Sequence, residues 1–185
     1  MHIKKKLLKP SGFTIVELLI VIVVIAILAA ITIVAYNGIQ NRANDTAVKS
    51  DLKTIAKKLA LYRANNSSYP SNIGEAIASD ELYKIVVSKS AYYTDSDITF
   101  NFTYCSMSPY TDYAVLAMSK SGARLYILNG SLGEYTGSTD WKAASGIATI
   151  CRSVLAGSTN AGTVGYNVQS GVSSPGWRAW TGVSS

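Results

Sequence analysis

The sequence Lys9-Pro10-Ser11-Gly12-Phe13-Thr14-Ile15-Val16-Glu17-Leu18-Leu19-Ile20, with the apolar run that follows it, decides the fold. From Ile15 to Ala35 the only polar residues are Glu17 and Thr32. About 20 apolar residues, each adding ~1.5 Å to a helix, are enough to cross the ~30 Å hydrocarbon core of a bilayer. The run therefore predicts a membrane-spanning helix.

Basic residues precede this run and predict its orientation. They are Lys4, Lys5, Lys6 and Lys9. Lysines beside a membrane helix favour the cytoplasmic side, so the chain after the helix is expected to face outward.

Glu17 is the unusual residue of the run. A carboxylate at this depth costs roughly 2–3 kcal/mol to insert, so such residues usually serve a partner or a pathway. The alternative is that Glu17 lies near the interface, where its side chain reaches the headgroups.

An ordinary secretory signal explains the stretch poorly. Such signals have an apolar core of about 7–15 residues followed by a small-x-small cleavage site. This run is longer, contains Glu17, and is not closely followed by an Ala-x-Ala sequence. A plain signal anchor is possible, but it accounts neither for Gly12-Phe13-Thr14 nor for Glu17.

The segment Gly12-Phe13-Thr14-Ile15-Val16-Glu17-Leu18-Leu19 resembles the leader junction of type IV pilins and type II secretion pseudopilins. In that family a membrane peptidase cuts after the glycine and methylates the new N-terminus. The resemblance implies cleavage between Gly12 and Phe13 and an N-methylated Phe13. The family's assembly glutamate, four residues after the phenylalanine, falls on Glu17. The likeness covers about residues 4–62, and beyond them it rests on general layout.

The resemblance also implies a division of the chain and a set of partners. The expected parts are a leader (1–12), a transmembrane and assembly helix (13–35), an amphipathic helix (36–65) and an α+β head with a Gly/Ser-rich C-terminal region (66–185). The expected partners are further copies of the chain, a prepilin peptidase, an assembly platform in the inner or cytoplasmic membrane, and the membrane itself.

A filament gives Glu17 a physical role. A free amine on Phe13 of one subunit and the carboxylate of Glu17 on its neighbour are each costly alone among packed apolar helices, so pairing them sets the axial register.

Residues 36–65 predict an amphipathic continuation of the helix. Apolar residues recur at mostly three- and four-residue steps and form one stripe that is expected to hold a sheet; they include Val48, Leu52, Ile55 and Leu59. Asp45, Lys49, Lys53 and Lys57 share another face. That face is interpreted as solvated, with a track for an anionic polymer as the alternative.

The head predicts a small antiparallel sheet, so the expected fold class is α+β with a long N-terminal helix packed on that sheet. Strands are expected at Ile98–Tyr104, Tyr113–Met118 and Ala123–Leu128 because their apolar and β-branched residues follow strand patterns. A short helix is expected from Asn72, and the pattern fades after Asn129. The segment Ala148–Arg152 is interpreted as an extended piece beside Cys105.

The chain has two cysteines, Cys105 and Cys151, both on the translocated side. An even number there favours one disulfide, which would close a loop of about 46 residues. Two unpaired buried thiols are the alternative. A disulfide in the C-terminal part of the head is common in pilins.

The net charge and the types of residue present argue against several classes of function. The formal charge of +6 falls to +2 when the four leader lysines are removed, so no nucleic-acid partner is predicted. The single histidine lies in the leader, and no catalytic constellation, cofactor loop or metal cluster is evident. Asp95-Ser96-Asp97 is interpreted as a solvated turn, with calcium binding as the alternative, because the distal ligands of a calcium loop are missing.

The sequence thus predicts a structural, non-enzymatic subunit of a type IV pilus-like filament, made as a single-pass membrane precursor and placed outside the membrane after assembly. A type II secretion pseudopilin or a minor pilin is the nearest alternative. A signal-anchored surface module that never polymerises, and that binds a glycan or polymer through its aromatic C-terminal region with Trp177 and Trp180, is the alternative from another class.

Overall fold

The computed structural model describes residues 12–71, 82–83, 85–94, 101–141, 144–158, 160–163, 166–167 and 176–177. The helix predicted from Asn72, the Asp95-Ser96-Asp97 turn and Trp180 lie outside these ranges. The chain divides into two compact units, residues 1–40 and 41–185, and each is described by itself.

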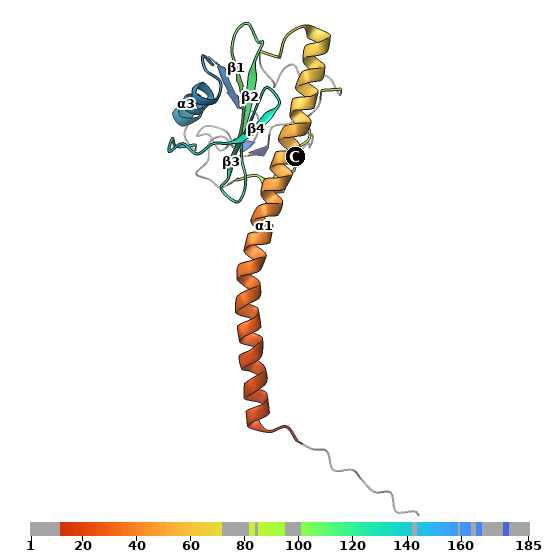
Figure 1. The fold of residues 1–185 in the computed structure, drawn as a ribbon, viewed down its shortest axis with the longest axis vertical. Helices are drawn as coiled ribbons and strands as arrows, with labels where there is room; N and C mark the ends of the chain where they lie inside the picture. Colours follow the sequence, from red (N-terminus) through yellow and green to blue (C-terminus); the bar gives the residue numbers. More distant parts are fainter. Residues whose placement is uncertain are drawn as a thin grey trace, which may run out of the picture. The chain divides into compact units, whose positions relative to one another are not determined.

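The predicted long helix is present as α1, Ile15–Asn66, a continuous helix of 52 residues (Figure 1). It ends at Asn66 because Ser67 takes a left-handed conformation, with φ 64°. The Ser67 amide then donates to the carbonyl of Arg63 at 2.8 Å, which satisfies one of the carbonyls left open at a helix end.

In the first unit, α1 is apolar on all sides. The large apolar side chains between Ile15 and Ile33 are each at least 47% exposed. This segment is long and apolar enough to cross a membrane. A helix with such a surface needs lipid or other apolar helices around it.

The second unit contains a five-stranded antiparallel sheet in the order β4-β3-β2-β1-β5. Its strands are β1 (Phe102–Ser106), β2 (Tyr113–Met118), β3 (Arg124–Leu128), β4 (Ser131–Glu134) and β5 (Asn160–Thr163). A short 3₁₀ helix, η1 (Lys89–Ala91), precedes the sheet, and β6 (Tyr166–Asn167) pairs with β7 (Gly176–Trp177) apart from it. The predicted α+β class is confirmed.

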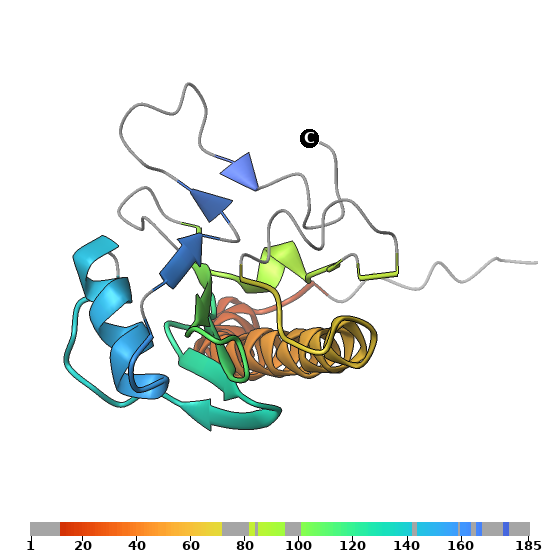
Figure 2. The same cartoon turned by 90° about the horizontal axis from the view of Figure 1, so that it is seen from above.

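The second unit has three layers: the later part of α1, the sheet, and the helix α3 (Ala144–Val154), as Figure 2 shows. The predicted stripe on α1 is buried with one face of the sheet only over its later part: Val48, Leu52, Ile55 and Leu59 are at most 1% exposed, whereas Tyr36 and Ile39 at its start are 65% and 68% exposed. The other face of the sheet is buried with α3. Because both faces are covered, every residue of β1 and β2 is buried.

The interpretation of Ala148–Arg152 as an extended piece was wrong, because these residues belong to α3. Ile147, Ile150, Cys151 and Val154 recur at helical three- and four-residue steps and form the face of α3 that the sheet covers. The β-branched residues within the segment favoured a strand, but the periodicity of its apolar residues determined the structure.

Strand β4 was missed, although the sequence carries a signal for it. Asn129 and Gly130 have φ of 49° and 91°, and the flanking Leu128 and Ser131 are directly paired. These are the positive φ values of a type I′ hairpin turn, for which Asn-Gly is the preferred pair. The dipeptide therefore marks a hairpin where only a fading pattern was inferred.

Asp51 fastens the segment before the sheet to α1. Its carboxylate accepts hydrogen bonds from the Ser88 amide at 2.7 Å, the Ser88 hydroxyl at 3.2 Å and the Tyr92 hydroxyl at 3.1 Å. Burial raises the pKa of Asp51, and the hydrogen bonds from Ser88 and Tyr92 oppose that rise without cancelling it.

This geometry predicts a pH-dependent difference between the wild-type chain and Asp51→Asn. Because the pKa of Asp51 lies above 3.8 in the folded chain, the folded state binds the proton more tightly than the unfolded state. The contribution of Asp51 to stability therefore falls as the pH rises from below 3.8 through the folded pKa.

Urea unfolding of the detergent-solubilised chain, followed by circular dichroism across this pH window, measures the effect. The wild-type free energy of unfolding should decline relative to that of Asp51→Asn as the pH rises. A wild-type chain that gains stability relative to the variant would contradict the assigned direction.

Candidate processing and assembly site at the start of the long helix

The Gly12–Phe13 peptide bond lies in exposed backbone without regular structure, just before α1. The Phe13 side chain is 90% exposed, and no atom lies within 4 Å of where a Gly12 side chain would begin. A peptidase needs access to such a non-helical bond, so the geometry suits the cleavage predicted between these residues.

Thr14 and Glu17 form a reciprocal pair at the first turn of α1. The amide and the hydroxyl of Thr14 donate to Oε2 of Glu17 at 2.8 Å and 2.7 Å. The Glu17 amide in turn donates to the Thr14 hydroxyl at 3.2 Å. This arrangement is a capping box, which satisfies amides that would otherwise be left open at the helix start.

Thr14 caps the helix, a role that the sequence interpretation did not assign to it. Its signal is the Thr-x-x-Glu spacing of Thr14-Ile15-Val16-Glu17, directly ahead of an apolar helix. The cap explains why α1 begins at Ile15, and it holds the carboxylate of Glu17 close to Phe13.

The site leaves part of the Glu17 carboxylate unused. Gly12, Phe13, Thr14 and Glu17 line a hollow of about 220 Å³. Within the described residues both hydrogen bonds to the Glu17 carboxylate are accepted by Oε2, and Oε1 has no partner. Oε1 can therefore accept a charge-assisted hydrogen bond from an amine without opening the cap.

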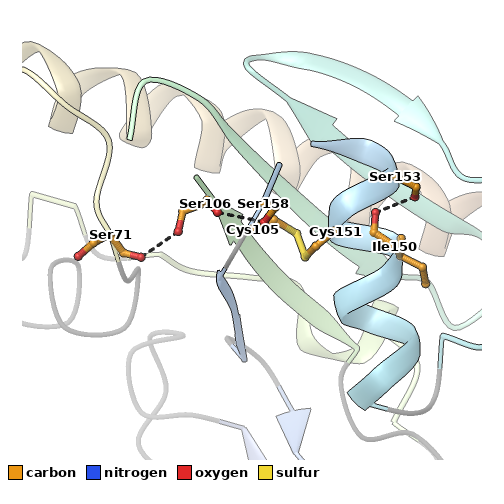
Figure 3. Close-up of a disulfide and its surroundings, with 7 residues drawn as sticks. All are labelled: Ser71, Cys105, Ser106, Ile150, Cys151, Ser153 and Ser158. Atoms are coloured by element: carbon orange, nitrogen blue, oxygen red, sulfur yellow. Dashed lines mark hydrogen bonds between the residues drawn. A yellow bond between two sulfur atoms is a disulfide. The ribbon is translucent and has the colours of Figure 1, made fainter. Parts of the chain in front are cut away.

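The other predicted pair, Cys105 and Cys151, forms a disulfide between β1 and α3 (Figure 3). The two Cα atoms are 5.6 Å apart and 46 residues apart in sequence. Hydroxyl groups fasten the same region, because Ser158 donates to the carbonyl of Ser106 and Ser106 donates to the carbonyl of Ser71, each at 3.0 Å. In the chain-entropy account, closing such a loop contributes about 4 kcal/mol.

Among the residues that the structure describes, no three His, Cys, Asp or Glu side chains gather as metal ligands would. The two aspartates considered for calcium, Asp95 and Asp97, are not among those residues.

Comparisons with known proteins show similarity to two kinds of relatives and to one family model. Residues 8–33 match the family model of the prokaryotic N-terminal methylation motif. The type IV wide pilus major component PilA4 of Thermus thermophilus is 36% identical over 100 residues, which are 54% of this chain and 69% of that protein. No solved structure matches the chain.

Type II secretion system core protein G is a second kind of relative. The Pseudomonas aeruginosa protein is 39% identical over 61 residues, 33% of this chain and 43% of its own length. The Vibrio cholerae protein is 31% identical over 67 residues, 36% of this chain and 46% of its own length. The chain thus spans less than half the length of these secretion relatives.

The leader motif, the apolar helix and the disulfide-closed head define a membrane-anchored precursor of a filament subunit. The chain belongs to the type IV pilin family.

The capping box predicts an effect of Thr14→Val on the first turn of α1. Valine removes the hydroxyl that receives the Glu17 amide, at a cost of about 1 kcal/mol, so that amide should exchange with solvent about fivefold faster. Amide hydrogen exchange measured by NMR on the full chain in micelles gives the rate.

Thr14→Ser is the matched control, because serine keeps the capping hydroxyl and should retain the wild-type protection. Equal protection of the Glu17 amide in the valine variant would show that the cap does not hold this turn.

Proposed function

We propose that the chain is the structural subunit of a type IV pilus-like filament, cleaved between Gly12 and Phe13 and N-methylated on Phe13. The observation that carries the proposal is the position of Glu17. The capping box holds its carboxylate next to the exposed Gly12–Phe13 bond with one oxygen still available.

Cleavage creates the partner that this oxygen lacks. Before cleavage the Phe13 nitrogen belongs to a peptide bond and carries no charge, whereas afterwards it is a positively charged amine. In the assembled filament, Glu17 of one subunit accepts this amine from its neighbour and fixes the axial register. Leaving either charge unpaired among apolar helices costs ~3–5 kcal/mol, so misaligned neighbours are disfavoured.

The apolar surface of α1 supplies the driving force for assembly. Its exposed leucine, isoleucine and valine side chains are covered by lipid in the precursor and by other copies of the helix in the filament. Close packing and charge pairing, rather than removal from water alone, then favour the filament over the dispersed membrane form.

The proposed partners follow from this route. They are a prepilin peptidase that acts on the cytoplasmic side, an assembly platform in the inner or cytoplasmic membrane, and further copies of the chain. The proposal includes no cofactor and no catalytic activity.

A pseudopilin of a type II secretion system is the second candidate. The matches to core protein G, up to 39% identical, favour it. They extend over only 61 and 67 residues, however, whereas the match to the pilus component extends over 100. The match to the pilus component is longer than the 52-residue helix α1, so it includes part of the head and favours a pilus subunit over a pseudopilin.

The first test is the intact mass and the N-terminal sequence of the protein recovered from membrane and surface fractions. The expected product begins at Phe13 and carries one added methyl group. A surface protein that begins at Met1 would contradict the proposal and leave a signal anchor.

The second test is Glu17→Gln, which separates charge from capping. Glutamine keeps the capping box, since its carbonyl accepts the same hydrogen bonds, but it carries no negative charge. We expect normal cleavage and a normal disulfide, with filament recovery reduced at least about tenfold, because the Phe13 amine is then unpaired.

Filament yield is measured by shearing cells and quantifying the subunit in the released fraction. Glu17→Asp, which keeps the charge on a shorter stem, is the companion variant and should retain more assembly than glutamine. Wild-type yields from Glu17→Gln would refute the pairing role.

A further inference from the structure

An apolar groove lies between α1 and the turn that joins β3 to β4. Its volume is about 380 Å³, and it is lined by Lys53, Ala56, Lys57, Ala60, Ile127 and Gly130. The floor is apolar, whereas the two lysines are exposed. Residues four apart on a helix are neighbours, so both ammonium groups can reach one anion.

These lysines have no partner within the described part of the chain. Neither Lys53 nor Lys57 takes part in an ion pair or side-chain hydrogen bond there, whereas Lys58 and Lys89, for example, do have interactions. The sequence alone indicated a solvated basic face. The structure adds an apolar floor beside two of its cations, which favours a carboxylate on an aliphatic stem.

The described carboxylates leave one candidate for that anion. Glu17, Asp45, Asp51, Asp112 and Asp140 all have interactions within the chain. Glu134, the last residue of β4, is exposed and is the only described carboxylate without a partner. The two lysines of the groove and Glu134 are thus oppositely charged groups without partners on the surface of the same unit.

The groove and Glu134 lie at opposite ends of β4. Gly130 precedes the strand and Glu134 is its last residue, so four residue steps of ~3.3 Å place them about 13 Å apart along the strand. Complementary patches at different places on one molecule make head-to-tail contacts, and such contacts can continue into an open helical filament.

We propose that the groove receives Glu134 of a second copy of this chain, with its carboxylate between Lys53 and Lys57 and its methylene groups on Ala56 and Ala60. This inference rests on the proposed filament function, and it assigns one contact between neighbouring heads. Its energy comes from charge pairing at a partly desolvated site, which contributes most to specificity and register.

Charge reversal tests the contact. Glu134→Lys and Lys57→Glu, each made in the full chain, place like charges together in the proposed contact and should reduce filament recovery about tenfold. The double variant restores opposite charges with exchanged positions and should recover to within about twofold of the wild type.

Lys120→Glu is the matched control. Lys120 is an exposed lysine in the turn between β2 and β3 and does not line the groove, and its reversal lowers the net charge by two, as Lys57→Glu does. It should assemble like the wild type. Formation of the Cys105–Cys151 disulfide, checked by non-reducing electrophoresis, shows that the head of each variant has folded.

A cysteine pair gives an independent measurement that does not depend on charge. Lys57→Cys combined with Glu134→Cys should form cross-links between subunits in oxidised filaments, seen as a ladder without reductant. Each single cysteine variant serves as the control. Filaments of the double variant without such a ladder would overturn the contact.

The outcomes separate the two proposals. A wild-type chain that is processed but forms no filament contradicts the proposed function. Wild-type filaments together with normal assembly of both single reversals overturn only the contact, and so does failure of the double reversal to recover.

Discussion

Every backbone hydrogen-bonding group of a membrane segment must find its partner inside the chain, and this constraint governs the molecule. A continuous α1 meets it, because each turn of the helix satisfies the turn before. The same helix serves two environments. Between Ile15 and Ile33 its side chains suit an apolar surrounding on all sides, whereas from Val48 to Leu59 a single stripe is buried against the sheet.

The polar groups of the first turn follow from this constraint. The amides at the start of α1 have no preceding turn, and Thr14 and Glu17 supply the missing acceptors. The presence of Glu17 in the apolar run thus has two explanations: it caps the helix within the subunit, and it is proposed to pair with an amine of the neighbouring subunit. The cap also provides a reason for a carboxylate at this position in a single dispersed subunit.

The sequence predicted the parts of the fold that have strong periodicity. The extent of α1, its buried stripe, the second and third strands and the disulfide followed from apolar spacing and cysteine location. The segment that forms helix α3 was interpreted as extended, because Ile150 and its β-branched neighbour suit a strand locally. Its apolar residues at helical spacing are buried against the sheet, and this burial stabilises the helix. Strand β4 depended on one dipeptide, Asn129-Gly130, within an otherwise polar segment.

The candidate site also contains residues that the sequence identified and residues that only the structure revealed. Gly12, Phe13 and Glu17 were identified by a resemblance, whereas Thr14 required either the capping-box rule or the hydrogen bonds themselves. The groove beside Lys53 and Lys57 could not be predicted, because its wall comes from Ile127 and Gly130, some 70 residues later in the chain. Only the packing of α1 against the sheet brings these residues together.

The disulfide between Cys105 and Cys151 makes maturation of the head depend on the side of the membrane on which the head lies. Both sulfur atoms are buried, and one belongs to a central strand while the other belongs to a helix that follows much later. In the reducing cytoplasm both cysteines remain thiols, and the disulfide forms only on the oxidising side of the membrane. The disulfide therefore forms only after the head has been translocated, so subunits that contain it are those whose head has already crossed the membrane.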